Sequence, residues 1–132
     1  MKENLSRLLE SIYGKSVKIK SSKPISGGCI NETQVLSLSN GERVFLKYNS
    51  SPQKNFFVTE ADGLRLLEKS KNGPSVPRTL GISQESNPKF LLLEYIESSV
   101  PKVGFASRFG HALAEMHRET QKQYGLDHDN FI

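Results

Sequence analysis

Apolar and polar positions recur with two different periods along this chain, and these periods predict its helices and strands. Residues 2–13 are expected to form an amphipathic helix, because apolar side chains recur there every three or four positions, at Leu5, Leu8, Leu9 and Ile12. Gly14 is a natural C-terminal stop for that helix. Residues 16–24 predict a strand, because Val17 and Ile19 alternate with Lys18 and Lys20 before Pro24.

The next segment predicts a hairpin. Val35 and Leu38 stand among polar residues in a half-buried strand pattern, and Asn40-Gly41 is a strong signal for a tight turn between two strands. Residues two apart in a strand share a face, so Phe45 and Lys47 are expected to point the same way. Val44 and Leu46 then point to the opposite face.

The second half of the chain predicts two more helices and two more strands. Ser51 could cap a helix with Pro52 at its first position, and this helix is expected to end near Lys69. Residues 79–83 predict a weak strand. The most apolar run in the chain, 90–96, predicts a buried strand. A last helix is expected from about Gly104 to Gln121, with an apolar stripe at Phe105, Phe109, Leu113 and Met116.

Together these elements predict an α+β fold. We expect a five-stranded antiparallel sheet with one helix inserted after the third strand, preceded by an N-terminal helix. Residues 1–96 are predicted to form one unit, and 97–132 a linker and a further helix. Full burial of an apolar side chain contributes about 1.5–3 kcal/mol, so the four-residue stripe of the last helix needs a partner to cover it.

Composition narrows the class of protein. A chain of 132 residues with 36% hydrophobic and 24% charged residues is typical of a single soluble globular domain. No run is long enough for a membrane span, and the N-terminus lacks the apolar block of a signal peptide. The single cysteine excludes an internal disulfide and favours a reducing compartment, so we expect a cytoplasmic protein. The scattered histidines and cysteine show no metal-ligand spacing, and the adjacent Asp127, His128 and Asp129 rarely converge on one ion.

The net charge of +4 is a mild basic excess that concentrates near the start of the chain. Four lysines carry it: Lys15, Lys18, Lys20 and Lys23. Nucleic-acid binding would favour aromatic residues interleaved with these lysines, and none occurs there. A solvated strand face is therefore the simpler interpretation, and we expect no nucleic-acid partner.

Two features carry candidate chemistry. Gly27 and Gly28 allow a sharp bend whose exposed N–H groups could hold an anion, although a Gly-Gly pair is more often just a turn. Glu60 interrupts the otherwise apolar stripe formed by Phe57, Leu64 and Leu67. Either Glu60 reaches water at the edge of the stripe, or it pairs with a buried cation, for which Lys47 is the obvious candidate.

These residues, in this order, resemble the small lobe of the protein-kinase-like fold, and specifically the fructosamine kinase (ketosamine-3-kinase) family, a relative of the aminoglycoside phosphotransferases. The resemblance covers nearly the whole chain and is carried by the following stretches: Ser26-Gly-Gly-Cys-Ile-Asn-Glu32, Val44-Phe-Leu-Lys-Tyr-Asn49, Glu60-Ala61 with Gly63-Leu64, Val76-Pro77, Leu92-Leu-Glu-Tyr-Ile96, Leu113-Ala-Glu-Met-His117, Gly125-Leu126-Asp127 and Asp129-Asn130-Phe131-Ile132. The Gly-Gly-Cys-Ile loop distinguishes this family from other kinase-like families.

The resemblance implies ATP-dependent phosphorylation of the sugar part of fructosamines or related ketosamines, free or on proteins, which labilises the adduct and repairs the amine. Lys47 would hold the α- and β-phosphates and pair with Glu60, and Phe45 would lie against the adenine. The loop of Gly27, Gly28, Cys29, Ile30 and Asn31 would cover the phosphates. The hinge would be Glu94, Tyr95 and Ile96, with the Glu94 carbonyl and the Ile96 N–H on the adenine edge.

The sequence departs from such kinases in one large respect. It contains no His-Gly-Asp, Asp-Pro or Asp-Phe-Gly, so the general-base aspartate and the magnesium ligands of the family are missing. We therefore expect a small lobe plus the first helix of a truncated large lobe. We also expect no activity of this chain in isolation, and Mg²⁺ binding only with the missing lobe. The alternative is a non-catalytic nucleotide-binding or interaction module. A reading frame that continues past Ile132 to His-Gly-Asp would favour the kinase, and a stop codon the module.

Cys29 is the candidate redox-sensitive residue. It is the only thiol, and loop N–H groups that converge as an anion site would also favour its thiolate. The resemblance points the same way, because family members with this cysteine can form disulfide-linked dimers, so a homodimer through Cys29 is expected under oxidation. The alternative is a small hydrophobic side chain packed beneath the loop.

Overall fold

A computed structural model of the chain describes residues 1–25, 30–126 and 128–129. The elements of this described part follow in the order α1 (Lys2–Tyr13), β1 (Ile19–Pro24), β2 (Glu32–Leu38), β3 (Arg43–Asn49), α2 (Phe56–Glu68), β4 (Thr79–Ser83), β5 (Lys89–Glu94) and α3 (Phe105–Met116). The strands form one five-stranded antiparallel sheet in the order β1-β2-β3-β5-β4. The predicted α+β class, with one helix inserted between the third and fourth strands, is confirmed.

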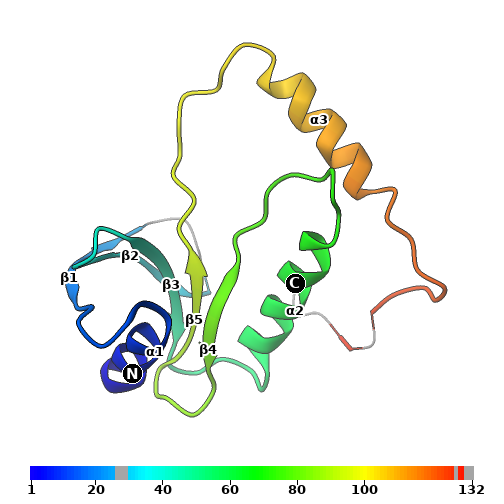
Figure 1. The fold of residues 1–132 in the computed structure, drawn as a ribbon. Helices are drawn as coiled ribbons and strands as arrows, with labels where there is room; N and C mark the ends of the chain where they lie inside the picture. The colour runs from blue at the N-terminus through cyan, green and yellow to red at the C-terminus, as the bar shows by residue number, and fades with distance from the viewer. Residues whose placement is uncertain (26–29, 127, 130–132) are drawn as a thin grey trace.

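The sheet separates two hydrophobic clusters. α1 covers one face, where Leu5 and Leu9 pack with Val44, Leu46 and other buried residues of β2, β3 and β5. α2 covers the other face, where Phe57 and Ala61 pack with side chains of β5. Figure 1 shows the two helices on either side of the sheet, with α3 set apart beyond a long connection.

β5 lies in the middle of this arrangement, and its sequence reflects that position. Phe90 and Leu92 point into the cluster beneath α1, whereas Leu91 and Leu93 point into the cluster beneath α2. Each of these side chains is at most 5% exposed. A strand that is covered on both faces reads as a continuous apolar run, which is why this segment lacks the alternation of a half-exposed strand.

Glycine is required at two places in the sheet. Gly41 has a φ of 90° in the turn between β2 and β3, where Leu38 donates its N–H to the Glu42 carbonyl at 2.8 Å. A Cβ at Gly81 in β4 would lie 2.6 Å from Leu8 Cδ2, so the absence of a side chain lets α1 approach the sheet. The predicted Asn40-Gly41 hairpin is confirmed.

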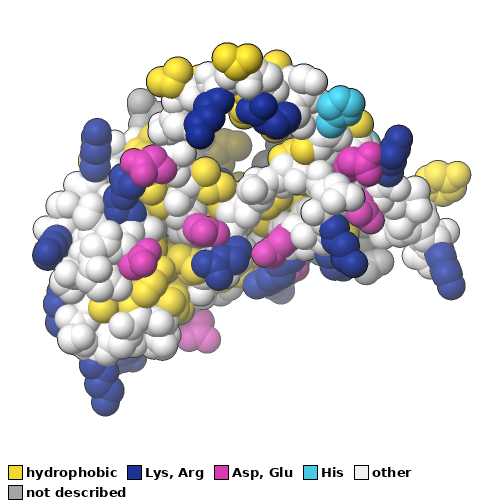
Figure 2. Space-filling view, turned by 45° about the horizontal axis from the view of Figure 1, so that its top comes forward, with side chains coloured by type: hydrophobic (Ala, Val, Ile, Leu, Met, Phe, Trp, Pro, Cys, Tyr) yellow, Lys and Arg dark blue, Asp and Glu magenta, His cyan; other side chains and the backbone are white. Residues whose placement is uncertain are grey.

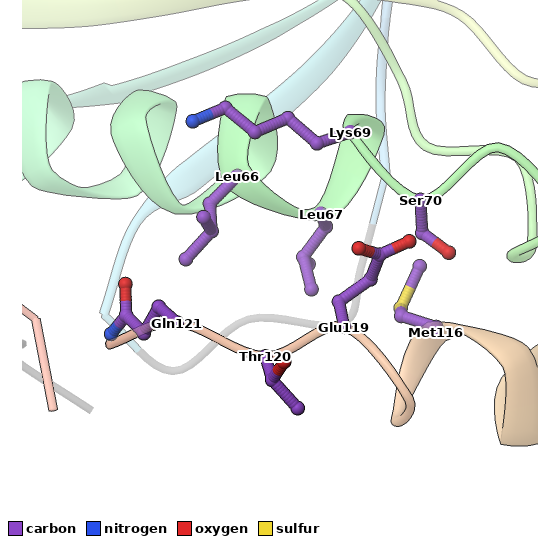
Figure 3. A pocket seen from close by; sticks show the side chains of 8 residues that line it. All are labelled: Leu66, Leu67, Lys69, Ser70, Met116, Glu119, Thr120 and Gln121. Atoms are coloured by element: carbon purple, nitrogen blue, oxygen red, sulfur yellow. The ribbon is translucent and has the colours of Figure 1, made fainter. Parts of the chain in front are cut away.

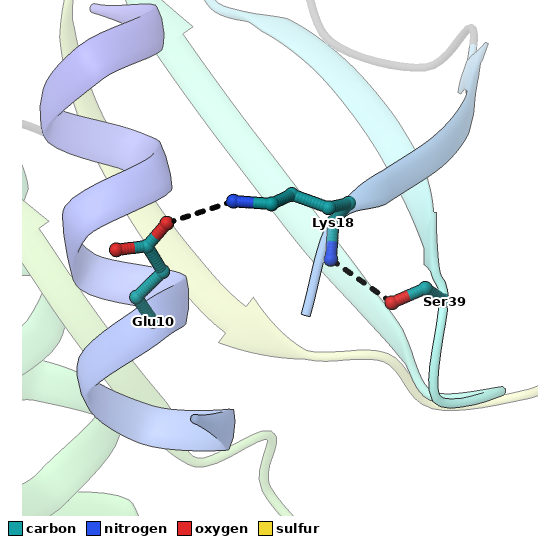
Figure 4. Close-up of polar contacts among 3 residues, drawn as sticks. All are labelled: Glu10, Lys18 and Ser39. Carbon is teal, nitrogen blue, oxygen red and sulfur yellow. Dashed lines mark hydrogen bonds and ion pairs between the residues drawn. The ribbon is translucent and has the colours of Figure 1, made fainter. Parts of the chain in front are cut away.

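A polar link joins α1 to the edge of the sheet. Lys18 Nζ lies 3.0 Å from Glu10 Oε1, and the Lys18 backbone N–H donates to Ser39 Oγ, also at 3.0 Å (Figure 4). Ser39 in turn donates its N–H to the Lys18 carbonyl at 2.8 Å. One lysine of the basic N-terminal run is thus engaged in a local ion pair.

Several predicted boundaries are wrong. The first strand begins at Ile19 rather than 16, and all six of its residues are exposed, because β1 is an edge strand that neither helix covers. Val17 is buried but lies ahead of the strand, whereas Ile19, the other apolar residue of the alternation, is 39% exposed. Helix α2 begins at Phe56, not at Pro52, because Asn55 adopts a left-handed backbone conformation with a φ of 63°, through which a right-handed helix cannot continue.

The last strand and the last helix are shorter than predicted. β5 ends at Glu94, where its pairing with β3 stops opposite Val44, so 95–96 lie beyond the sheet. α3 ends at Met116 rather than near Gln121, because the amides of Arg118 and Glu119 bond to carbonyls three residues back and tighten the last turn.

Candidate functional site

The predicted ion pair between the third strand and the inserted helix is present. Lys47 Nζ lies 2.5 Å from Glu60 Oε1, and the two side chains are only 23% and 19% exposed. β3 presents Lys47 on the α2 side of the sheet, the same face as Phe45, while Val44 and Leu46 pack beneath α1. Glu60 lies three residues after the buried Phe57 and therefore on the same face of α2, which turns its carboxylate toward Lys47. The pairing interpretation of Glu60 is therefore confirmed.

A shallow cavity lies at the end of β5 on this face of the sheet. Its volume is about 330 Å³, and its lining is mostly apolar: Ile25, Phe45, Pro77, Leu93, Glu94, Tyr95, Ile96 and Ser98. Phe45 is two positions from Lys47 on the same strand face, so a flat ring held against Phe45 lies close to a paired ammonium group. The structure thus brings Phe45 and the predicted hinge residues together.

Two arginines, Arg43 of β3 and Arg78 just ahead of β4, contact the segment that leaves β5. Arg78 Nε lies 3.1 Å from Glu94 Oε2, and the Arg78 carbonyl accepts the Glu94 N–H at 2.9 Å. The hydrogen bond from the Arg78 side chain lowers the pKa of the Glu94 carboxyl below its ordinary value, with the Arg78 backbone N–H acting in the same direction. On the other side, Arg43 Nη2 lies 2.8 Å from Glu97 Oε2, and the Arg43 guanidinium lies 4.7 Å from the centre of the Tyr95 ring.

The exit of the glycine loop is tied to the end of β3. Asn49 Nδ2 donates to the Ile30 carbonyl at 2.9 Å and to Asn31 Oδ1 at 3.1 Å, while Asn49 Oδ1 accepts the Ser51 N–H. Ile30 and Asn31 therefore lie beside the strand that carries Lys47. The other loop residues predicted to bind phosphate, Gly27, Gly28 and Cys29, lie outside the described residues.

A second cavity lies between the ends of α2 and α3 (Figure 3). Its volume is about 360 Å³, and Leu66 and Leu67 of α2 point across it toward Met116, Thr120 and Gln121. Leu67, predicted on the apolar stripe of α2, is 43% exposed here rather than packed on the sheet. The lining contains neither Lys47 nor Phe45, so the chemistry of a nucleotide favours the cavity at the end of β5.

The α3 stripe is largely uncovered, as expected. None of the twelve residues of α3, all of them described, is buried. Phe105 and Phe109 stack with ring centres 5.8 Å apart and are 49% and 45% exposed.

Residues 1–25, 30–126 and 128–129 contain neither a membrane-spanning helix nor a cluster of metal ligands. No helix in that part is both long and apolar enough to cross a bilayer. Within the same residues no group of three or more His, Cys, Asp and Glu side chains could hold a metal ion. Basic and acidic side chains are interspersed over the face shown in Figure 2.

The sequence did not reveal the polar residues that support the site. No pattern in the sequence singled out Asn49, Arg43 or Arg78. Arg43 begins β3, beside the end of the neighbouring strand β5. That pairing becomes visible only when β5 is placed beside β3.

Comparison with known proteins gives a consistent result. The sequence model described as fructosamine kinase matches residues 1–132. The probable ketoamine kinases of Enterococcus faecium and Pasteurella multocida are 33% and 31% identical over 109 and 134 aligned residues, which cover 83% and 100% of this chain but 37% and 46% of those proteins. The crystal structure of a protein assigned as a fructosamine-3-kinase from Haemophilus somnus matches with a TM-score of 0.86 and 31% identity, over 100% of this chain and 44% of that one. A similarly assigned structure from Thermobifida fusca gives a TM-score of 0.73 and 25% identity, over 96% and 42% of the two chains. The chain thus spans less than half the length of these relatives.

Proposed function

Because the chain belongs to the fructosamine kinase family, we propose that it is the nucleotide-binding part of an ATP-dependent kinase that phosphorylates the sugar moiety of fructosamines or related ketosamines. Phosphorylation of such adducts would serve the repair of glycated amines. The observation that carries the proposal is the Lys47–Glu60 ion pair on the strand face that also presents Phe45 to the cavity at the end of β5.

The residues present fit an adenine nucleotide. The cavity supplies apolar walls for a planar ring, and Phe45 and Ile96 lie on its lining. The Glu94 carbonyl and the Ile96 N–H would contact the adenine edge, with Tyr95 between them. Lys47 is held near the expected position of the phosphates by Glu60, which leaves part of the ammonium available to a second anion because the pair is not fully buried.

The exit of the glycine loop would approach the phosphates from the opposite side. Asn49 holds Ile30 and Asn31 beside β3, and Gly27, Gly28 and Cys29 would complete the loop. ATP supplies the phosphoryl group, and Mg²⁺ would neutralise its phosphates. The 132 residues contain no His-Gly-Asp motif, so none of them is assigned as the general base or as a magnesium ligand.

A second candidate function is a non-catalytic nucleotide-binding or interaction module. The stacked and half-exposed Phe105 and Phe109 favour it, since an uncovered aromatic pair is typical of a contact surface. The two functions differ in whether nucleotide binding leads to phosphoryl transfer.

Calorimetric titration of ATP into the purified chain tests the proposal. We expect saturable binding that weakens by about tenfold or more in Lys47→Ala, since a charge-assisted contact to phosphate contributes about 1.5–3 kcal/mol. Lys20→Ala, an exposed lysine on β1, is the matched control and should bind like the parent. Equal binding by Lys47→Ala and Lys20→Ala would contradict the assignment of Lys47. We further expect no phosphorylated fructosyl-lysine from this chain alone in a ³¹P NMR assay.

A further inference from the structure

We propose that Arg43 and Arg78 are positioning residues, which hold the segment 94–97 in the conformation that presents its backbone to an adenine ring. The inference rests on the proposed function, because it assumes that this segment faces a nucleotide. It concerns two exposed arginines that do not line the cavity themselves.

The topology places these arginines on opposite sides of the same strand end. β5 lies between β3 and β4 in the sheet, and its pairing with β3 ends where Val44 faces Glu94. Arg43, one residue earlier in β3, therefore lies across from the first residue beyond β5. Arg78 immediately precedes β4 and bonds to Glu94 from the other side.

Arg43 holds the part of the segment that has left the sheet. Its guanidinium pairs with Glu97 at 2.8 Å and lies 4.7 Å from the centre of the Tyr95 ring. Ile96, between these two contacts, is 53% exposed. Residues 95–97, all of them described, pair with no strand. The two contacts of the Arg43 side chain therefore restrain a backbone segment that would otherwise lose its conformational freedom only when a ligand binds.

Arg78 holds the start of the segment 94–97 by contacting the Glu94 side chain. The Arg78 backbone N–H points to Glu94 Oε2 at 3.4 Å, and the Arg78 Nε–H donates to the same oxygen at 3.1 Å. The carboxylate thus takes the acceptor position that a continuing strand would give to the Glu94 carbonyl. The Glu94 carbonyl is the group expected to accept a hydrogen bond from the adenine amino group.

The test separates adenine recognition from phosphate recognition. Adenosine and inorganic tripolyphosphate are titrated separately into the parent chain, Arg43→Gln and Arg78→Gln. Arg118→Gln is the matched control, because Arg118 forms a comparable exposed ion pair with Glu115, at 2.7 Å, on α3. We expect Arg43→Gln and Arg78→Gln, the two hinge variants, each to weaken adenosine binding by about threefold to tenfold. This range matches the small interaction energies of exposed ion pairs and cation–π contacts. Tripolyphosphate binding should stay within about twofold of the parent in all variants.

A second readout distinguishes positioning from general stabilisation. The ¹H–¹⁵N signal of Ile96 should shift on addition of adenosine to the parent and to Arg118→Gln, and shift less in Arg43→Gln. If Arg43→Gln fails to fold, Glu97→Gln removes the same ion pair from the opposite partner and is measured instead.

The outcomes are distinct. If both hinge variants bind adenosine with the affinity of the parent chain, the inference is overturned and the proposed function stays intact. Equal weakening of adenosine and tripolyphosphate would also overturn it, because the arginines would then support the fold as a whole. If the parent binds neither ligand, the proposed function fails and the inference fails with it.

Discussion

The ion pair between Lys47 and Glu60 is the contact whose contribution to the free energy of unfolding can be worked out most directly from the structure. The pair joins β3 to α2 across the face that carries the candidate nucleotide site, and its atoms lie 2.5 Å apart. A double-mutant cycle with Lys47→Met, Glu60→Gln and the combined variant isolates the energy of this contact from the other effects of each substitution.

The expected coupling energy follows from the partial burial of the two side chains. Two unit charges about 4 Å apart attract by about 4 kcal/mol at an effective dielectric constant of about 20, but much of this is offset by the loss of hydration. Exposed pairs retain about 0.2–1 kcal/mol, whereas breaking a fully buried pair costs about 3–5 kcal/mol. With exposures of 23% and 19%, the Lys47–Glu60 pair lies between these limits, and we expect a coupling of about 1–2 kcal/mol.

The assay is equilibrium unfolding in urea, followed by circular dichroism, for the four proteins of the cycle. The pair Asp62–Arg65 on the same helix is the control, because its side chains are 40% and 54% exposed at a separation of 2.7 Å. Its coupling, from Asp62→Asn and Arg65→Gln, should stay below about 0.5 kcal/mol. A Lys47–Glu60 coupling no larger than that of the control pair would refute the argument that partial burial strengthens this contact.

Three further predictions concern the loop, the hinge and the thiol. Asn49→Ala removes two hydrogen bonds to the loop exit and one from the Ser51 amide, and it should lower the free energy of unfolding by about 1–2 kcal/mol, measured in urea; no change would show that these bonds are replaced by water. The pKa of the Glu94 carboxyl, measured by carbon-detected NMR, should lie below its ordinary value and return toward it in Arg78→Gln. Because the folded-state pKa is lowered, this pair stabilises the fold fully above the ordinary glutamate pKa, and the contribution is lost as the pH falls through the lowered value; an unshifted pKa in the parent contradicts this. Mild peroxide should oxidise Cys29 and produce a dimer on non-reducing gels, whereas a thiol that stays free in a monomer would favour a packed, inert cysteine.

The sequence predicted the fold more completely than it predicted the limits of the elements. Apolar periodicity identified α1, the hairpin and the buried run of β5, because each depends on short-range spacing. It missed that β1 is exposed on both sides, because the neighbours of a strand depend on the order of the whole sheet. The predicted start of α2 was wrong because Asn55 takes a left-handed backbone conformation, which no short-range pattern in the sequence indicated.

The candidate site shows the same division between local and long-range information. Lys47 and Glu60 were predictable as candidate partners, because a lone carboxylate in an apolar helical stripe either reaches water or pairs with a cation, and Lys47 was the obvious cation. The pairing of Arg43 with Glu97 was not, since these residues are far apart in sequence and meet only because β3 and β5 are adjacent. Polar contacts at the surface leave no periodic signal in a sequence, whereas buried apolar faces do.

The most direct test of the proposed nucleotide site is a ¹H–¹⁵N NMR titration of the 132-residue chain with ATP. The account predicts saturable shifts at Phe45, Lys47, Tyr95 and Ile96, which line or adjoin the cavity at the end of β5. Shifts confined to the exposed lysines of β1, or no saturable shift at these four residues, would contradict it.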